Sequence, residues 1–305
     1  MGSVIRVFSS VALVLCLGVS FAHAEENTKS KAKIEKIKKK AKKKKKGGVE
    51  DNAALASFTG GSGGFRFIGS LTHVPKLRND QEDTSEIFLA TDYTLNKKHR
   101  FRLQQFFTKF YSKFESEHEF KPTDTQIAHF YTPDFKPFGA RLMWRTGVAL
   151  PISNESARDD LITRFTGSLI ASKMFFKNKL MVFAVPYARY HWYEFKTSVS
   201  GRPLPWYTAG MSTSLIYFLS PKLSVSGTGN YNYEWVRNSQ FDQDQDQIAN
   251  GIYRFDLSVA YQFTPEFSAS LGYFQGANYM QDGRYEVVFF DDQESRYSLG
   301  VTAIF

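Results

Sequence analysis

The chain of 305 residues contains one cysteine, Cys16, which lies near the N-terminus. The rest of the sequence can therefore form no disulfide framework and no cysteine-based site. Long apolar runs are also scarce, and none after the N-terminus reaches the roughly 18 residues of a membrane-spanning helix. HExxH, CxxC and paired-carboxylate motifs are absent as well. We therefore predict that the protein is not an enzyme and has no catalytic residue, metal site or cofactor.

The N-terminus has the parts of a secretory signal peptide. Arg6 precedes an apolar run over residues 7–19, and Ala22 and Ala24 form an A-x-A cleavage site. The apolar run is too short to cross a bilayer as a helix. We expect residues 1–24 to be removed on export.

A lysine-rich arm follows and carries the net charge of the chain. Residues 25–48 hold twelve lysines against three glutamates, which equals the formal net charge of +9, so the remainder is close to neutral. Like-charge blocks are normally disordered, and the glycine-rich segment 60–64 adds flexibility. We expect 25–62 to be a disordered periplasmic arm. Its expected partner is anionic periplasmic material, with a solvated arm without partners as the alternative. Nucleic acid is not expected, because the chain is exported.

Residues 63–305 alternate between polar and apolar with the period of β-strands. The pattern predicts an all-β domain, an antiparallel up-and-down barrel of about twelve strands. Segment 124–133 is the weakest of them, because His129 and Tyr131 blur its alternation. The predicted strands are 65–75, 85–96, 99–112, 124–133, 138–150, 160–176, 179–195, 205–219, 222–236, 250–263, 267–282 and 294–305.

Two kinds of connection separate these strands. Proline and asparagine mark the short turns, since they supply turn geometry and interrupt a ladder. The short turns are 96–98, 133–137, 177–179, 220–222 and 264–266, and the longer polar connections are 76–84, 113–123, 151–160, 196–204, 237–249 and 282–294. Strict alternation of the two kinds predicts an even number of strands, with both chain ends on the side of the short turns.

The last predicted strand ends on Phe305. Its apolar face consists of Tyr297, Leu299, Val301, Ala303 and Phe305. This strand, the signal peptide and the alternating loops together resemble bacterial outer-membrane β-barrel proteins. The resemblance implies the outer membrane of a Gram-negative bacterium, with N- and C-termini in the periplasm. It also implies contact with membrane lipid and lipopolysaccharide, and insertion by the outer-membrane assembly machinery through those five residues.

A secreted soluble sandwich or lipocalin-like barrel would show the same alternation but would bury its apolar face. Two features weigh against it. Aromatic residues cluster toward strand ends, as they do in membrane-interface girdles. The polar faces carry arginine in mid-strand, which a dry core would have to pair.

The polar faces define the predicted lumen. Its three carboxylates are Asp92, Glu234 and Asp256. Its nine arginines are Arg66, Arg100, Arg102, Arg141, Arg145, Arg164, Arg189, Arg254 and Arg296. Arginine is always charged and suits carboxylate, phosphate and sulfate, so the surplus predicts a narrow channel for small anions or acidic solutes. In general layout only, this resembles the arginine-lined monomeric porins that pass acidic oligosaccharides.

Other functions stay open. Twelve strands fall between filled small barrels and open porins, so salt bridges could plug the lumen and leave a structural barrel tethered by its basic arm. Four further side chains are expected to face inward and narrow the lumen: Phe106, Met143, Phe183 and Tyr187.

An outer-membrane lipid hydrolase is the least favoured alternative. Such enzymes use a serine activated by histidine, and no histidine here has a serine two residues away on its own strand face. A cross-strand pair is still allowed, since the two groups need to be neighbours only in space. The histidines that would follow the signal peptide are His73, His99, His118, His129 and His191. The acidic loop 240–247 lacks the pattern of a calcium site, although it could share divalent cations with lipopolysaccharide.

Overall fold

The computed structural model describes residues 64–75, 83–111, 120–198, 201, 203–237, 246–278, 280–281, 284–285 and 295–305. The predicted signal peptide with Ala22 and Ala24, the lysine arm, His118 and most of the acidic loop 240–247 lie outside these residues. Within the described part, no helix combines the length and apolar character that a membrane span requires.

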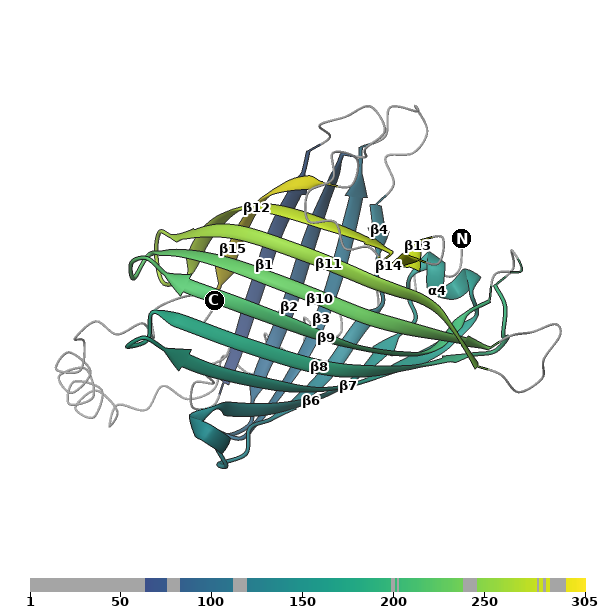
Figure 1. The fold of residues 1–305 in the computed structure, drawn as a ribbon, viewed down its shortest axis with the longest axis horizontal. Coiled ribbons are helices and arrows are strands. Elements are labelled where there is room, and N and C mark those ends of the chain that lie inside the picture. Colours follow the sequence, from purple (N-terminus) through teal and green to yellow (C-terminus); the bar gives the residue numbers. More distant parts are fainter. Residues whose placement is uncertain are drawn as a thin grey trace, which may run out of the picture. The chain divides into compact units, whose positions relative to one another are not determined.

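Twelve antiparallel strands form one closed up-and-down barrel (Figure 1). The fourth strand consists of two pieces, β4 and β5, which both pair with β3. A separate small hairpin joins β13 (Met280–Gln281) and β14 (Arg284–Tyr285). The barrel strands are β1 (Gly64–Val74), β2 (Thr84–Thr94), β3 (His99–Phe110), β4 (Phe120–Pro122) with β5 (Thr125–Tyr131), β6 (Arg141–Leu150), β7 (Leu161–Phe175), β8 (Leu180–Tyr193), β9 (Pro205–Phe218), β10 (Leu223–Arg237), β11 (Asp246–Gln262), β12 (Phe267–Asn278) and β15 (Arg296–Ile304).

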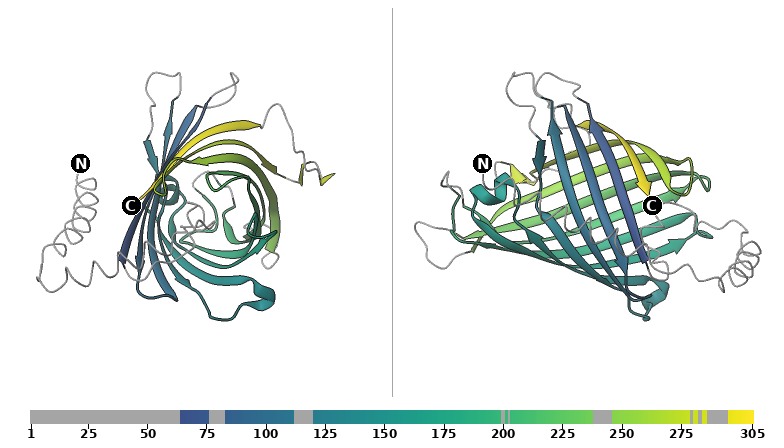
Figure 2. Two further views of the ribbon diagram at one scale, coloured as in Figure 1. Left: turned by 90° about the vertical axis from the view of Figure 1, so that its left-hand side faces the viewer. Right: turned by 180° about the vertical axis from the view of Figure 1, so that it is seen from behind.

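Each strand pairs with its neighbours in the chain, and β15 closes the ring on β1. The strands surround a common axis when the barrel is turned (Figure 2, left). The prediction of a twelve-stranded antiparallel barrel is confirmed, including the fourth strand. Five short connections alternate with longer ones, so the start of β1 and the end of β15 lie at the same end of the barrel.

Side chains alternate between an apolar outer wall and a polar inner wall. On β1, Phe65, Phe67 and Leu71 are 67%, 52% and 44% exposed, whereas Arg66 is half-buried and Ile68 is buried between them. The same period-two pattern runs through the other strands, because successive side chains of a strand point to opposite faces. The exposed outer wall carries aromatic residues near both ends of the strands. Examples at the short-turn end are Phe65, Tyr93, Phe101, Tyr217 and Phe263, and at the other end Tyr190 and Trp192.

The structure corrects one strand boundary and adds detail to one connection. The fifth strand begins at Arg141 rather than 138, because Pro137–Gly139 forms a 3-10 turn in which Phe138 has a φ of 52° and cannot continue a ladder. The polar connection 151–160 has regular structure of its own. It contains a short helix, α4 (Asn154–Arg158), whose first turn is capped by the Ser153 side chain accepting from the backbone N–H of Ser156.

Candidate functional site

The structure places all nine predicted arginines on barrel strands, on the face opposite the exposed apolar side chains. They separate into three groups around the lumen. Arg66, Arg100 and Arg102 lie on β1 and β3; Arg141, Arg145, Arg164 and Arg189 lie on β6, β7 and β8; Arg254 and Arg296 lie on β11 and β15.

One carboxylate, that of Asp92, forms ion pairs with all three arginines of the first group. Asp92 of β2 is the register partner of Arg66 on one side and of Arg102 on the other. Its Oδ2 lies 2.5 Å from Nη2 of Arg66, and its Oδ1 accepts from Nε of Arg102 at 2.6 Å. Nη1 of Arg100 lies 3.5 Å from Oδ2. Asp92 is only 1% exposed, so it is a buried anion whose charge is compensated by three cations.

The aromatic ring of Phe130 packs against the arginines of this cluster. Phe130 of β5 is buried and faces the lumen, with the guanidinium carbons of Arg100 and Arg102 at 4.4 and 5.5 Å from its centroid. Arg145 approaches the same ring at 5.8 Å. Arg100 and Phe130 are neighbours of Met143, which is also buried. The expectation that Met143 and Phe183 face inward agrees with this burial.

The second group, which we call the β6–β8 arginines, makes no close ion pair among the described residues. Among the described residues, no carboxylate pairs with Arg141, Arg145 or Arg189, and Asp124 lies 3.9 Å from Nη2 of Arg164. Arg145 donates from Nη2 to Oε1 of Gln126 at 3.1 Å. Its Nε is buried and has no hydrogen-bond partner among the residues that the structure describes. Guanidinium donors that face the lumen without a close carboxylate can bind an anion from solution.

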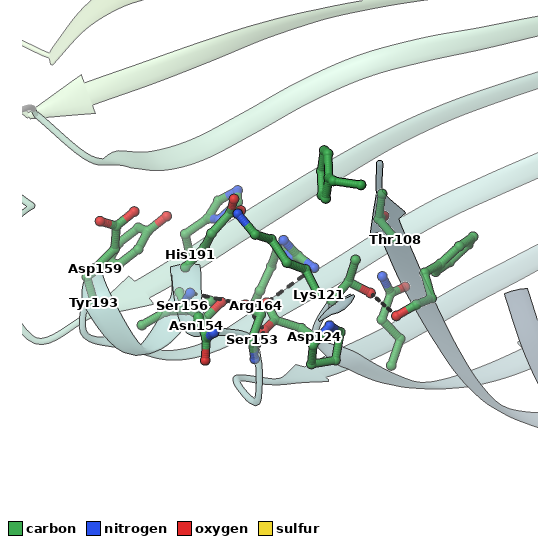
Figure 3. Close-up of a pocket in the computed structure, with 17 residues that line it drawn as sticks. Thr108, Lys121, Asp124, Ser153, Asn154, Ser156, Asp159, Arg164, His191 and Tyr193 are labelled. Carbon is green, nitrogen blue, oxygen red and sulfur yellow. Dashed lines mark hydrogen bonds and ion pairs between the residues drawn. The ribbon is translucent and has the colours of Figure 1, made fainter. Parts of the chain in front are cut away.

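A cavity of about 470 Å³ lies beside Arg164, at the end of the barrel with the longer connections. Inward side chains of β3, β5, β7 and β8 line it, together with α4 (Figure 3). Asp124 fixes α4 at this place: its Oδ1 accepts from Oγ of Ser153 at 2.9 Å, and its Oδ2 accepts from Oγ of Ser156 at 2.7 Å. All three residues are buried. The connection after β6 is thereby held against the lumen.

A second cavity, of about 310 Å³, contains the third group of arginines. Arg254 bonds to Asp256 at 2.9 Å, and Glu86 and Arg296 line the same space. The sequence analysis did not identify Glu86 and Asp124 as residues of the lumen. The expected ratio of nine arginines to three carboxylates therefore underestimates the number of luminal carboxylates. Glu86 lies on the same face of β2 as Asp92 and alternates with the outward-facing Ile87, and that alternation could have identified it.

A stretch of the inner wall is neutral and hydroxylated. Ser214 and Thr228 form a hydrogen bond of 2.9 Å between β9 and β10, and Ser226 and Ser258 form one of 2.7 Å between β10 and β11. Such groups can exchange hydrogen bonds with a hydroxylated solute. Among the described residues, no group of three or more His, Cys, Asp or Glu side chains is placed to hold a metal ion.

Comparison with known proteins gives similarity at the level of structure. No model of a known protein family and no curated protein matches the sequence. The COG4313 outer membrane channel from Pseudomonas putida F1 is 12% identical, over 80% of this chain and 96% of that chain, with a TM-score of 0.56. The NanC porin is 12% identical, over 79% and 99% of the two chains, with a TM-score of 0.49. The KdgM porin is 10% identical, over 78% of this chain and 99% of that chain, with a TM-score of 0.43.

The likeness to the Pseudomonas channel is one of fold. It agrees with the closed twelve-stranded ring, the exposed apolar wall and the polar interior described above. The chain therefore has the fold of an outer-membrane β-barrel, as the resemblance of its sequence implied.

Proposed function

We propose that the protein is an outer-membrane channel whose arginine-rich lumen passes small anions or acidic solutes. The β6–β8 arginines carry this proposal. They stand on three adjacent strands, and among the described residues the only carboxylate that forms an ion pair with them is Asp124, 3.9 Å from Arg164. Uncompensated cations in a confined aqueous space raise the local concentration of anions and repel cations.

The outer wall supports the proposed location. Large apolar side chains such as Phe67, Leu89 and Leu299 are about half exposed to the surroundings, and a bilayer would cover them. Short turns are periplasmic in outer-membrane barrels, so the start of β1 and the end of β15 would face the periplasm. Outer-membrane lipid and lipopolysaccharide are then the partners of the wall. The face of β15 that carries Tyr297, Leu299, Val301, Ala303 and Phe305 would be offered to the assembly machinery.

The lumen also suggests the chemistry of the solute. Arginines supply the charged contacts on one side, and the serine and threonine hydroxyls of β9 and β10 supply neutral hydrogen bonds beside them. An acid that also carries hydroxyl groups can use both walls. Small hydroxylated carboxylates therefore fit this interior better than purely inorganic anions do.

An occluded structural barrel is the second candidate, and a specific observation favours it. Met181, Phe183 and Phe218 form a buried apolar cluster on the inner wall near the short turns. This apolar cluster and the cluster around Asp92 together would fill part of the cross-section of the lumen. In this case the lysine arm would tether the barrel to anionic periplasmic material.

The reversal potential of the full-length protein in a planar bilayer under a salt gradient distinguishes the two. A channel of the proposed kind gives stable conductance with a strong preference for anions. Replacing Arg145 and Arg189 together by glutamine should lower that preference severalfold, because two luminal charges are lost. Lys173→Gln is the matched control, since this cation lies on the outer face of β7 and should leave selectivity unchanged. A folded barrel that conducts no ions contradicts the channel and supports the structural role.

A further inference from the structure

Five polar side chains gather on the outer wall, at the ends of β1, β2 and β3 that adjoin the longer connections. His73 is on β1, Asp83 and Ser85 are at the start of β2, and Lys109 and Tyr111 are at the end of β3. His73 is the register partner of Ser85, and Ser85 is the register partner of Lys109. They alternate with lumen-facing residues such as Thr72 and Glu86. They therefore lie on the outer wall, whose exposed side chains are mostly apolar.

Three of these side chains form a chain of polar contacts. Nδ1 of His73 lies 3.0 Å from Oγ of Ser85, and Nε2 of the same ring lies 3.5 Å from Oδ1 of Asp83. Within the described part of the chain this Oδ1 is buried and accepts no hydrogen bond. Catalytic hydrogen bonds are often longer than ideal in proteins without substrate and shorten on binding.

This order of groups is the one that activates a serine. A neutral imidazole accepts the hydroxyl proton on one nitrogen while its other N–H is directed at a carboxylate, which stabilises the imidazolium that forms. Many serine hydrolases place serine at Nε2, whereas here Ser85 faces Nδ1. The two nitrogens can exchange these roles because each is an acceptor when the other carries the hydrogen.

Tyr111 lies over the serine and the histidine. Its OH donates to Oγ of Ser85 at 3.3 Å, and its ring meets His73 edge-on with centroids 6.3 Å apart. Ser85 is 7% exposed under this cover, while Tyr111 itself is 43% exposed. A rotation of the Tyr111 side chain away from Ser85 would break this hydrogen bond and remove part of the cover over the hydroxyl. In that position its OH can donate to a carbonyl oxygen next to Ser85.

We propose that Ser85, His73 and Asp83 form an esterase site that cleaves acyl esters of lipids beside the barrel wall. Oγ of Ser85 attacks the ester carbonyl while its proton passes to Nδ1 of His73. The tetrahedral intermediate collapses, and His73 returns that proton to the leaving alcohol. Water then attacks the acyl-serine with His73 as the base, which releases a fatty acid and restores the serine. Each cycle consumes one ester and one water.

The position of the site selects lipids as the substrate class. An ester at the headgroup boundary of a bilayer would meet the ends of β1–β3, and the acyl chain would continue along Leu71 and Leu89 on the outer wall. Lys109, next to Ser85, can pair with an anionic headgroup. The proposal departs from the expectation of a non-enzymatic protein. It does not depend on conduction, because the lumen lies on the other side of the wall.

Labelling with a fluorophosphonate probe tests the nucleophile on the full-length folded protein. Wild-type protein should be labelled, Ser85→Ala should not, and His73→Gln should be labelled at least about 100-fold more slowly, which is the range for loss of a general base. Ser258→Ala is the matched control, because its hydroxyl is also bonded across strands, to Ser226, without a histidine. Heat-modifiability on gels shows that each variant is folded. Absence of label on the folded wild type, or equal label on Ser85→Ala, overturns the site.

Fatty-acid release from vesicles of phosphatidylethanolamine and phosphatidylglycerol tests the substrate class. Release that requires Ser85 and His73 supports lipid as the substrate. Ser85-dependent labelling without any release from these vesicles overturns lipid hydrolysis. Lys109→Gln provides a further measurement, since it should reduce release from anionic vesicles more than from neutral ones if it binds the headgroup.

Discussion

Phe67 and Phe305 exchange both of their backbone hydrogen bonds, each 2.8 Å long. These bonds extend the β1–β15 ladder beyond Ile304 and close the barrel at the short-turn end. The Phe305 side chain is 79% exposed on the outside of the wall. The backbone of this residue thus completes the sheet, while its ring is free to contact lipid or a protein that inserts the strand.

Replacing Phe305 by aspartate should reduce the amount of assembled, heat-modifiable protein. The backbone ladder can still form, but the exposed charge would oppose insertion of the last strand into the membrane. Phe305→Tyr is the control and should assemble normally. Equal yields of Phe305→Asp and wild type in outer-membrane fractions would contradict a role in assembly.

Asp92→Asn should destabilise the barrel strongly. The substitution leaves Arg66, Arg100 and Arg102 close together without their buried anion, and breaking a buried ion pair costs about 3–5 kcal/mol. The midpoint of unfolding in urea measures the loss. Asp256→Asn is the control, because its partner Arg254 has a side chain that is 53% exposed and solvent compensates the lost pair.

Gly210→Ala should also destabilise the fold. A Cβ at this position would lie 2.5 Å from the carbonyl oxygen of Tyr231 and 2.7 Å from Cζ of Tyr187. Overpacking of this kind costs about 1–3 kcal/mol. Gly229→Ala, on the adjacent strand, meets nothing within 4 Å and should be neutral. Similar unfolding midpoints for both variants would show that the wall relaxes around the methyl group.

Asp124→Ala should release α4 from the lumen wall. Ser153 and Ser156 would each lose a buried acceptor, at about 1–3 kcal/mol for each unsatisfied group. We expect faster proteolysis within 151–160 and, if the connection narrows the pore, a larger single-channel conductance. Asp134→Ala, which removes an exposed partner of Lys98, should change neither.

The sequence was sufficient to predict the barrel because its pattern is local and repeated. Alternation along each strand identified the walls, and proline and asparagine identified turns such as 96–98 and 220–222. Contacts between distant residues were beyond that reasoning. Asp124 follows β4 and binds Ser156 in a helix 32 residues away, and the pairing of His73 with Ser85 depends on the register of a hairpin. Spacing within one strand, the criterion applied to histidines, cannot detect such neighbours.

Close ion pairs are unequally distributed around the lumen, and we expect this to produce an electric field across it. The arginines of β1 and β3 surround Asp92, whereas among the described residues the β6–β8 arginines have no carboxylate closer than 3.9 Å. A solute with a carboxylate at one end would be turned by this field, with its acid toward β6–β8 and its hydroxyls toward the serines and threonines of β9 and β10. The pore would then discriminate between solutes of equal size and charge by the direction of their dipoles.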